Sequence, residues 1–124
     1  EKRVSVWKLL GAEMRLTTAK GRDDGPEYSS DGQGIYFNSD RTGRMDVWRM
    51  KSDGTQQEQV TSDPNSADWF AHPSPDGKWL AYSSSETGRP EVYVVPFPTG
   101  GGKWQISNSG GGYPRWRRDG RELF

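Results

Sequence analysis

His72 is the only histidine among the 124 residues, and a histidine could serve as the general base of a hydrolase. Such an enzyme also needs an activated nucleophile, and the chain has no Gly-x-Ser-x-Gly motif. A metal triad would need a second histidine or a cysteine, and neither is present. We therefore interpret His72 as a structural residue of a strand near the axis of the fold, and we expect no catalytic residue.

Several acidic side chains stand where a cation could bind. Asp23, Asp24, Asp63 and Asp68 precede two predicted strands at equivalent places. Carboxylates can hold Ca²⁺, but the spacing does not match a calcium-binding loop. Aspartate more commonly caps turns, so we expect neither a metal nor a cofactor.

A cluster of four arginines between residues 115 and 121 could grip an acidic partner or a phosphate. Asp119 and Glu122 reduce the net positive charge of this cluster. We therefore favour a role in which these charged residues protect a sheet edge from pairing with another chain. The glycine runs at 100–102 and 110–112 lack the lysine and helix of a phosphate loop, so they are interpreted as turns.

The composition limits the kinds of partner. Lys+Arg and Asp+Glu are 17 each, so the formal net charge is zero, which argues against a nucleic acid or a membrane surface. Only 30% of the residues are hydrophobic, but 6 Trp, 5 Tyr and 4 Phe can bury large areas. No apolar run is long enough for a transmembrane helix, and no signal peptide is present, so a mature or trimmed chain is expected.

Three sequence markers recur along the chain in the same order. The first is an Asp-Gly turn before an apolar run, at Asp31, Asp76 and Asp119, which are 45 and 43 residues apart. The second is a short amphipathic run, at 4–9, 45–50 and 90–95. The third is a short run that ends in a hydroxyl residue, at Thr17, Thr61 and Ser107. A repeat of about 44 residues with these features is typical of a propeller blade of four strands.

Each marker has a physical role in such a blade. The residues before Asp-Gly form the innermost strand, and the glycine supplies the positive φ of a hairpin turn. The apolar runs that follow, at 35–37, 79–82 and 123–124, form a buried second strand. No apolar stripe has helical spacing. The predicted fold class is therefore all-β, a propeller of four-stranded antiparallel blades.

The motif Pro-x-Tyr-Ser-x-Asp-Gly at 26–32, with its counterparts at 73–77 and 114–120, resembles the TolB-like β-propeller repeat, a relative of the WD repeat. The stretch 35–54 is similar to TolB-type proteins of bacterial envelopes, and the tail 92–124 is similar to propellers appended to bacterial serine/threonine kinases. The third repeat departs from the motif, because Arg117 and Arg118 replace the serine and its neighbour. The resemblance implies a periplasmic or other extracytoplasmic setting.

The repeats predict one partial propeller over residues 1–124, with about three blades. Residues 1–18 supply the outer half of a blade, 24–62 and 68–108 supply two full blades, and 112–124 supply an inner half. Closed propellers have four to eight blades. Either the chain is a piece of a longer propeller, or two copies pair as a homodimer that closes a six-bladed ring.

The favoured function is a non-catalytic scaffold that binds a protein or peptide through loops on one face. The alternatives are the propeller of a prolyl-oligopeptidase-like peptidase, a sugar lyase, and the extracytoplasmic sensor of a bacterial kinase. The peptidase would need a further hydrolase domain, and the lyase would need several histidines. The candidate binding face consists of Asp24, Asp40, Arg41, Arg44, Asp68, Trp69 and His72. Trp69 with Phe70 is the best exposed aromatic candidate, whereas most other tryptophans are expected in the core between blades.

Overall fold

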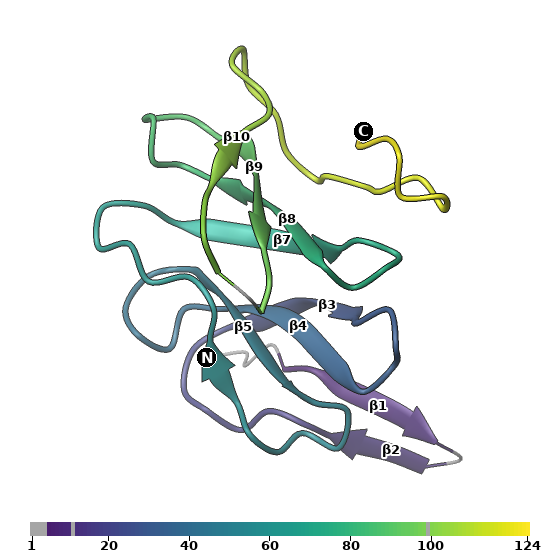
Figure 1. Ribbon diagram of the computed structural model, residues 1–124. Helices are drawn as coiled ribbons and strands as arrows, with labels where there is room; N and C mark the ends of the chain where they lie inside the picture. Colours follow the sequence, from purple (N-terminus) through teal and green to yellow (C-terminus); the bar gives the residue numbers. More distant parts are fainter. Residues whose placement is uncertain (1–4, 11, 99) are drawn as a thin grey trace.

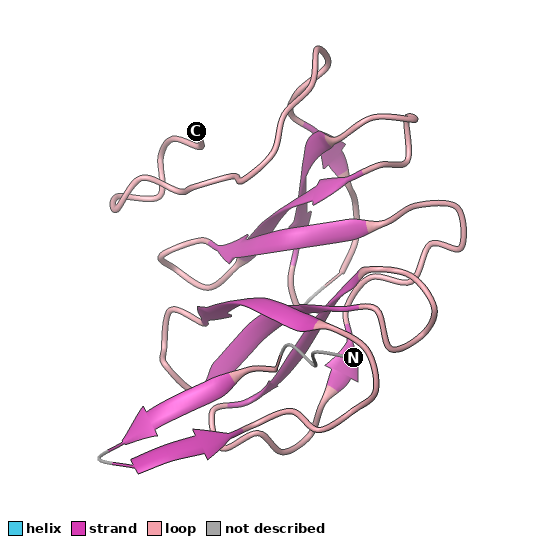
Figure 2. Cartoon of the chain, turned by 180° about the vertical axis from the view of Figure 1, so that it is seen from behind, coloured by secondary structure: helices cyan, strands magenta, loops and turns pink. Residues whose placement is uncertain are grey.

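The computed structural model describes residues 5–10, 12–98 and 100–124, and this part of the chain forms strands and turns without any helix (Figure 2). Accordingly, it offers no long apolar helix that would traverse a lipid bilayer. The strands of the described part are β1 (Trp7–Leu10), β2 (Ala12–Arg15), β3 (Asp23–Tyr28), β4 (Gly34–Ser39), β5 (Asp46–Lys51), β6 (Glu58–Gln59), β7 (Asp68–Pro73), β8 (Trp79–Ser84), β9 (Glu91–Pro96) and β10 (Trp104–Gln105).

The strands form two sheets of four strands each. The first sheet has the order β3-β4-β5-β6 and the second sheet has β7-β8-β9-β10, and every neighbouring pair is antiparallel. Figure 1 shows the two sheets side by side, with the β1–β2 hairpin and the C-terminal segment at opposite ends of the molecule. The predicted all-β class with four-stranded antiparallel blades is confirmed.

The two sheets can be set beside the predicted blade ranges, which stay a prediction. The first sheet lies within 23–59 and the second within 68–105, close to the predicted ranges 24–62 and 68–108. Residues 1–4, 11 and 99 of the predicted segments lie outside the described residues. The apolar run 123–124 forms an isolated bridge from Trp116 to Leu123 rather than a longer strand. The number of blades in a closed ring stays a prediction.

The serine before each of the first two Asp-Gly turns fixes the turn. Ser29 Oγ lies 2.6 Å from Asp31 Oδ1 and accepts the N–H of Gly34 at 2.9 Å. Ser74 repeats both contacts with Asp76 and Trp79, at 2.6 and 3.0 Å. These hydroxyl contacts lower the pKa of both aspartates. The serine therefore adds side-chain contacts to the hairpin.

The third turn keeps the backbone of the other two without a serine. The glycine φ angles at the three turns are 71°, 71° and 70°. In place of the serine, Arg117 pairs with Asp119 at 3.4 Å and with Glu122 at 3.0 Å. The Asp-Gly pair thus determines the turn, and the preceding position only reinforces it.

In each repeat, the hydroxyl residue of the third marker accepts a backbone hydrogen bond from the start of the third strand. Thr17 Oγ1 accepts the N–H of Val6 at 3.0 Å, and Thr61 Oγ1 accepts that of Val47 at 3.0 Å. Ser107 Oγ accepts the N–H of Val92 at 2.8 Å. The hydroxyl oxygen of the third marker therefore takes the place of a backbone carbonyl as the acceptor of this N–H, at the end of the strand pairing.

Apolar side chains pack between neighbouring sheets. One cluster joins Tyr36 and Val47 of the first sheet to Leu80 and Tyr82 of the second. A second cluster joins the N-terminal hairpin region to the first sheet through Val6, Leu16, Ile35, Phe37 and Met50. Burying these side chains stabilises each sheet only next to its neighbour.

Three tryptophans depart from the predicted core positions. Trp7, Trp79 and Trp104 are 54%, 37% and 49% exposed. Trp79 and Trp104 meet edge to face at 5.8 Å on the face of the second sheet beside the C-terminal hairpin. Trp7 aligns with Trp48 and with the buried Tyr93, whereas Trp79 and Trp104 align with Gly34 and the exposed Glu58 of the first sheet.

Candidate binding face at the inner strands

The innermost strands share an unusual backbone position. Gly25, Phe70 and Tyr113 occupy equivalent places in the three repeats and have φ angles of 58°, 57° and 55°. A shift of pairing register accompanies the first two, between Asp24 and Glu27 and between Trp69 and His72. Glycine adopts this left-handed conformation without strain, whereas an aromatic residue adopts it only with strain.

Side chains of the preceding sheet hold the two strained residues. Asn38 Oδ1 in β4 accepts the N–H of Phe70 at 2.8 Å. Ser83 Oγ in β8 accepts the N–H of Tyr113 at 3.3 Å. A strained backbone persists only where its surroundings determine it, and such places concentrate at functional sites.

The rings of Trp69, Phe70 and Tyr113 form what we name the aromatic cluster. Phe70 and Tyr113 stack with centroids 4.2 Å apart and an angle of 27° between planes. Trp69 meets Phe70 edge to face at 6.4 Å. Tyr113 is 65% exposed. The cluster therefore offers a rigid aromatic surface to solvent, which suits the anchoring of a partner side chain.

A charged ladder continues from the aromatic cluster along the inner strands. Two residues after the left-handed position, the three repeats carry Glu27, His72 and Arg115. Glu27 lies 3.3 Å from His72 Nε2 and 3.6 Å from Arg115. The carboxylate of Glu27 thus connects side chains from three successive repeats.

His72 is held on both ring nitrogens. The N–H of Trp116 donates to Nδ1 at 3.0 Å, and the indole N–H of Trp116 donates to the His72 carbonyl at 3.0 Å. Burial lowers the pKa of His72, Glu27 opposes this shift and Arg115 adds to it. A neutral imidazole that accepts at Nδ1 and donates from Nε2 to Glu27 satisfies all these contacts.

Asp24 is connected to the aromatic cluster through Asn38, and Asp40 is linked to Asp24 through Arg22. Asp24 accepts a hydrogen bond at 2.9 Å from Asn38, the residue that holds Phe70. Asp40 accepts the N–H of Arg22 at 2.7 Å, and the Arg22 side chain lies 4.0 Å from Asp24. The structure therefore joins Asp24 to the strand of Trp69 and Phe70 through Asn38, and Asp40 follows through Arg22.

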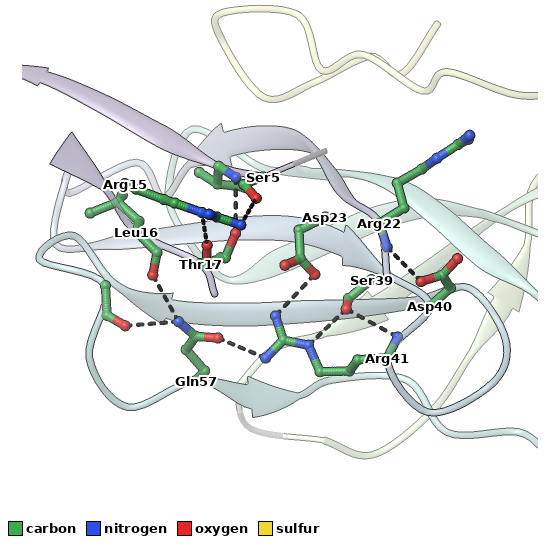
Figure 3. A network of polar contacts seen from close by, with 12 residues as sticks. Ser5, Arg15, Leu16, Thr17, Arg22, Asp23, Ser39, Asp40, Arg41 and Gln57 are labelled. Atoms are coloured by element: carbon green, nitrogen blue, oxygen red, sulfur yellow. Dashed lines mark hydrogen bonds and ion pairs between the residues drawn. The ribbon is translucent and has the colours of Figure 1, made fainter. Parts of the chain in front are cut away.

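Arg41, by contrast, turns into the molecule (Figure 3). Its guanidinium pairs with the buried Asp23 at 3.0 Å and donates to Ser39 and Gln57 at 2.7 Å each. Gln57 in turn donates to the carbonyl of Leu16 at 3.1 Å. Arg41 thus ties the first sheet to the N-terminal hairpin region and has little surface for a ligand.

Arg44 and Asp68 are also drawn away from the surface. Arg44 lies 3.4 Å from Asp46, which is fully buried. Asp68 is 2% exposed and accepts a hydrogen bond from Ser66 at 3.3 Å. No group of three or more potential metal-ligating side chains occurs among the described residues.

Tyr113 is the site residue that sequence reasoning missed. Its signal was available, because aligning the repeats places Gly25, Phe70 and Tyr113 in one column. A position that holds glycine in one repeat and aromatic residues in the other two indicates a left-handed backbone with exposed rings.

Comparison with known proteins supports this architecture. No family model matches the chain. The structure of a TolB from Agrobacterium tumefaciens aligns with a TM-score of 0.77 and 39% identity, over 89% of this chain and 44% of that protein. TolB from Acinetobacter baumannii aligns with a TM-score of 0.75 and 24% identity, over 91% of this chain and 28% of that protein. The chain has a TolB-like propeller fold, as the sequence motif predicted.

An uncharacterized protein of Agrobacterium fabrum is 53% identical over 74 residues, which cover 60% of this chain and 25% of that protein. The tricorn protease shares only the fold, with a TM-score of 0.62 and 19% identity. The chain spans less than half the length of each of these relatives.

Proposed function

We propose that this chain is part of a non-catalytic propeller scaffold that binds an extended segment of a protein partner. The aromatic cluster is the observation that carries the proposal. It combines two strained aromatic residues, a stacked pair of rings and a side chain that is 65% exposed. Loops and strand ends on a rigid scaffold are common binding surfaces.

Two features favour a peptide over a small molecule as the ligand. The cluster is an open surface whose rings come from two successive inner strands. Asp24 and Asp40, which are connected to it through Asn38 and Arg22, supply carboxylate acceptors for the N–H groups of an extended chain. The likeness to TolB structures supports an extracytoplasmic location for the same scaffold.

The test uses an array of random 12-residue peptides probed with the labelled chain. We expect the bound peptides to share aromatic or large aliphatic residues, and Tyr113→Gly to weaken their binding about tenfold or more. Glycine keeps the left-handed backbone, as Gly25 does in the first repeat. Trp7→Ala is the matched control, because Trp7 is 54% exposed on β1, away from the cluster. Capture of no peptide, or equal losses in both variants, would overturn the proposal.

We also propose that two copies pair to complete a six-bladed ring. An apolar groove of about 420 Å³ beside the C-terminal hairpin is lined by Trp79, Trp104, Ile106 and Leu123. The hairpin at 115–124 corresponds to the first two strands of a repeat, and β1–β2 corresponds to the last two. Light scattering over a dilution series should give twice 14.0 kDa. A monomeric mass throughout would exclude the ring.

A further inference from the structure

A cavity of about 380 Å³ lies between the two sheets, and none of the three rings of the aromatic cluster lines it. Its walls include Thr61 and Asp63 after β6, the buried Asp68 of β7, and Tyr82 and Lys103 of the second sheet. The two carboxylates are the acidic groups of the lining, and Lys103 is the only basic one among the described lining residues.

The first sheet shows what fills the equivalent place one repeat earlier. Asp23 begins β3 as Asp68 begins β7, and both are buried. In the first sheet, Arg41 pairs with Asp23 at 3.0 Å. Its guanidinium also lies 4.6 Å from the ring centroid of Trp48. This arrangement neutralises the buried carboxylate and closes the junction with the neighbouring hairpin region.

The second sheet lacks this arginine, because Glu86 stands at the position of Arg41. The cation over the equivalent ring is instead Lys103, 4.5 Å from the centroid of Tyr93, and it pairs with Glu86. Within the described residues, no lysine or arginine lies within ion-pair distance of Asp68, which receives one hydrogen bond from Ser66 at 3.3 Å. The first sheet has a filled junction, and the second has a cavity beside a buried carboxylate.

We propose that the cavity binds the guanidinium group of an arginine side chain carried by the partner peptide, which pairs with Asp68 as Arg41 pairs with Asp23 one repeat earlier. This inference rests on the proposed peptide-binding function. Asp68 is the pairing carboxylate, and Asp63 adds negative charge at the cavity wall. The charge of Lys103 is compensated by Glu86. A planar guanidinium suits a carboxylate beside an aromatic ring better than a point charge does.

The direct test measures binding of N-acetyl-arginine amide to the full chain by calorimetry, with the neutral isostere N-acetyl-citrulline amide as the comparison. We expect the arginine probe to bind and the citrulline probe to bind at least tenfold more weakly. Asp68→Asn should weaken the arginine probe by about tenfold or more, because it removes the pairing charge. Equal binding of the two probes, no binding of the arginine probe, or unchanged binding to Asp68→Asn would overturn the proposal.

A second variant keeps the test decisive if Asp68→Asn does not fold. The double variant Glu86→Arg, Lys103→Gln reproduces the Arg41–Gln57 pair of the first sheet, so it should place a guanidinium in the cavity and abolish probe binding. Retained probe binding in this variant would contradict the assignment. The two proposals separate clearly: Tyr113→Gly should leave the arginine probe unaffected. If the peptide array fails while the probe still binds, only the proposed peptide function is lost.

Discussion

The two sheets have the same frame but place a cation over their aromatic rings from different segments of the chain. In the first, a loop arginine, Arg41, lies over the rings of Phe37 and Trp48 and pairs with a buried aspartate. In the second, a lysine of the outermost strand region, Lys103, lies over the equivalent rings of Tyr82 and Tyr93. A cation over two aromatic rings is thus common to both sheets, but the chain segment that supplies it differs.

The carboxylates that begin the third strands differ in a similar way. Asp46 and Glu91 are both buried and both face an arginine. Burial raises the pKa of Asp46, whereas the hydroxyl of Ser107 lowers the pKa of Glu91. One repeat geometry therefore tolerates opposite local electrostatics, provided that each buried charge finds a partner.

The largest contrast should come from removing the two cations. Arg41→Met leaves the buried Asp23 without its partner, so we expect a loss of about 3–5 kcal/mol in the free energy of unfolding. Lys103→Met breaks a more exposed pair and should cost about 1 kcal/mol or less. Urea unfolding of both variants measures the difference. Equal losses would show that the two cations have the same structural role.

The next largest losses of stability are expected at the hydroxyl residues that accept a hydrogen bond from the start of each third strand. Thr61→Val leaves the N–H of the buried Val47 unpaired, which should cost about 1–3 kcal/mol. Ser107→Ala removes the acceptor for Val92 and a donor to Glu91, so its loss should be the larger one. Thermal and urea unfolding give both values. A smaller loss for Ser107→Ala would mean that Arg89 and Gly110 satisfy Glu91 without it.

The contribution of the turn serines to stability should depend on pH. The lowered pKa values of Asp31 and Asp76 contribute stability above the unfolded value of about 3.9, and this stability is lost as the pH falls through the lowered folded values. The double variant Ser29→Ala, Ser74→Ala should therefore lose less stability than the natural chain between pH 5 and pH 2. Urea midpoints along this range provide the test, and parallel curves would contradict it.

The smallest expected change in stability is at the aromatic cluster. Tyr113→Gly relieves a strained backbone but also removes the stacking of its ring on Phe70, so the free energy of unfolding should change by less than about 1 kcal/mol. Ser83→Ala, which removes the acceptor for the Tyr113 N–H, is expected to lower it slightly. A clear loss of stability in Tyr113→Gly would show that the ring packs as part of the core rather than as a binding surface.

The repeat period, the Asp-Gly turns and the strand-closing hydroxyls were predictable from the sequence. Each depends on residues close together in the chain, because a turn is determined by its own few residues and their side chains. The resemblance of these motifs to TolB-like repeats also predicted the fold that the comparisons show. The place of Trp69 beside Phe70 in an aromatic cluster follows from the same local pattern.

Only the tertiary structure decided which polar residues face solvent. The loop sequence around Asp40 and Arg41 is uniformly polar, yet Asp40 caps a backbone N–H and Arg41 turns inward to the buried Asp23. That pairing joins residues 18 positions apart and depends on how the sheet aligns them. Trp7 is exposed although the equivalent Tyr93 is buried, because burial also depends on which neighbouring sheet covers a face. The cavity beside Asp68 likewise depends on how the two sheets meet.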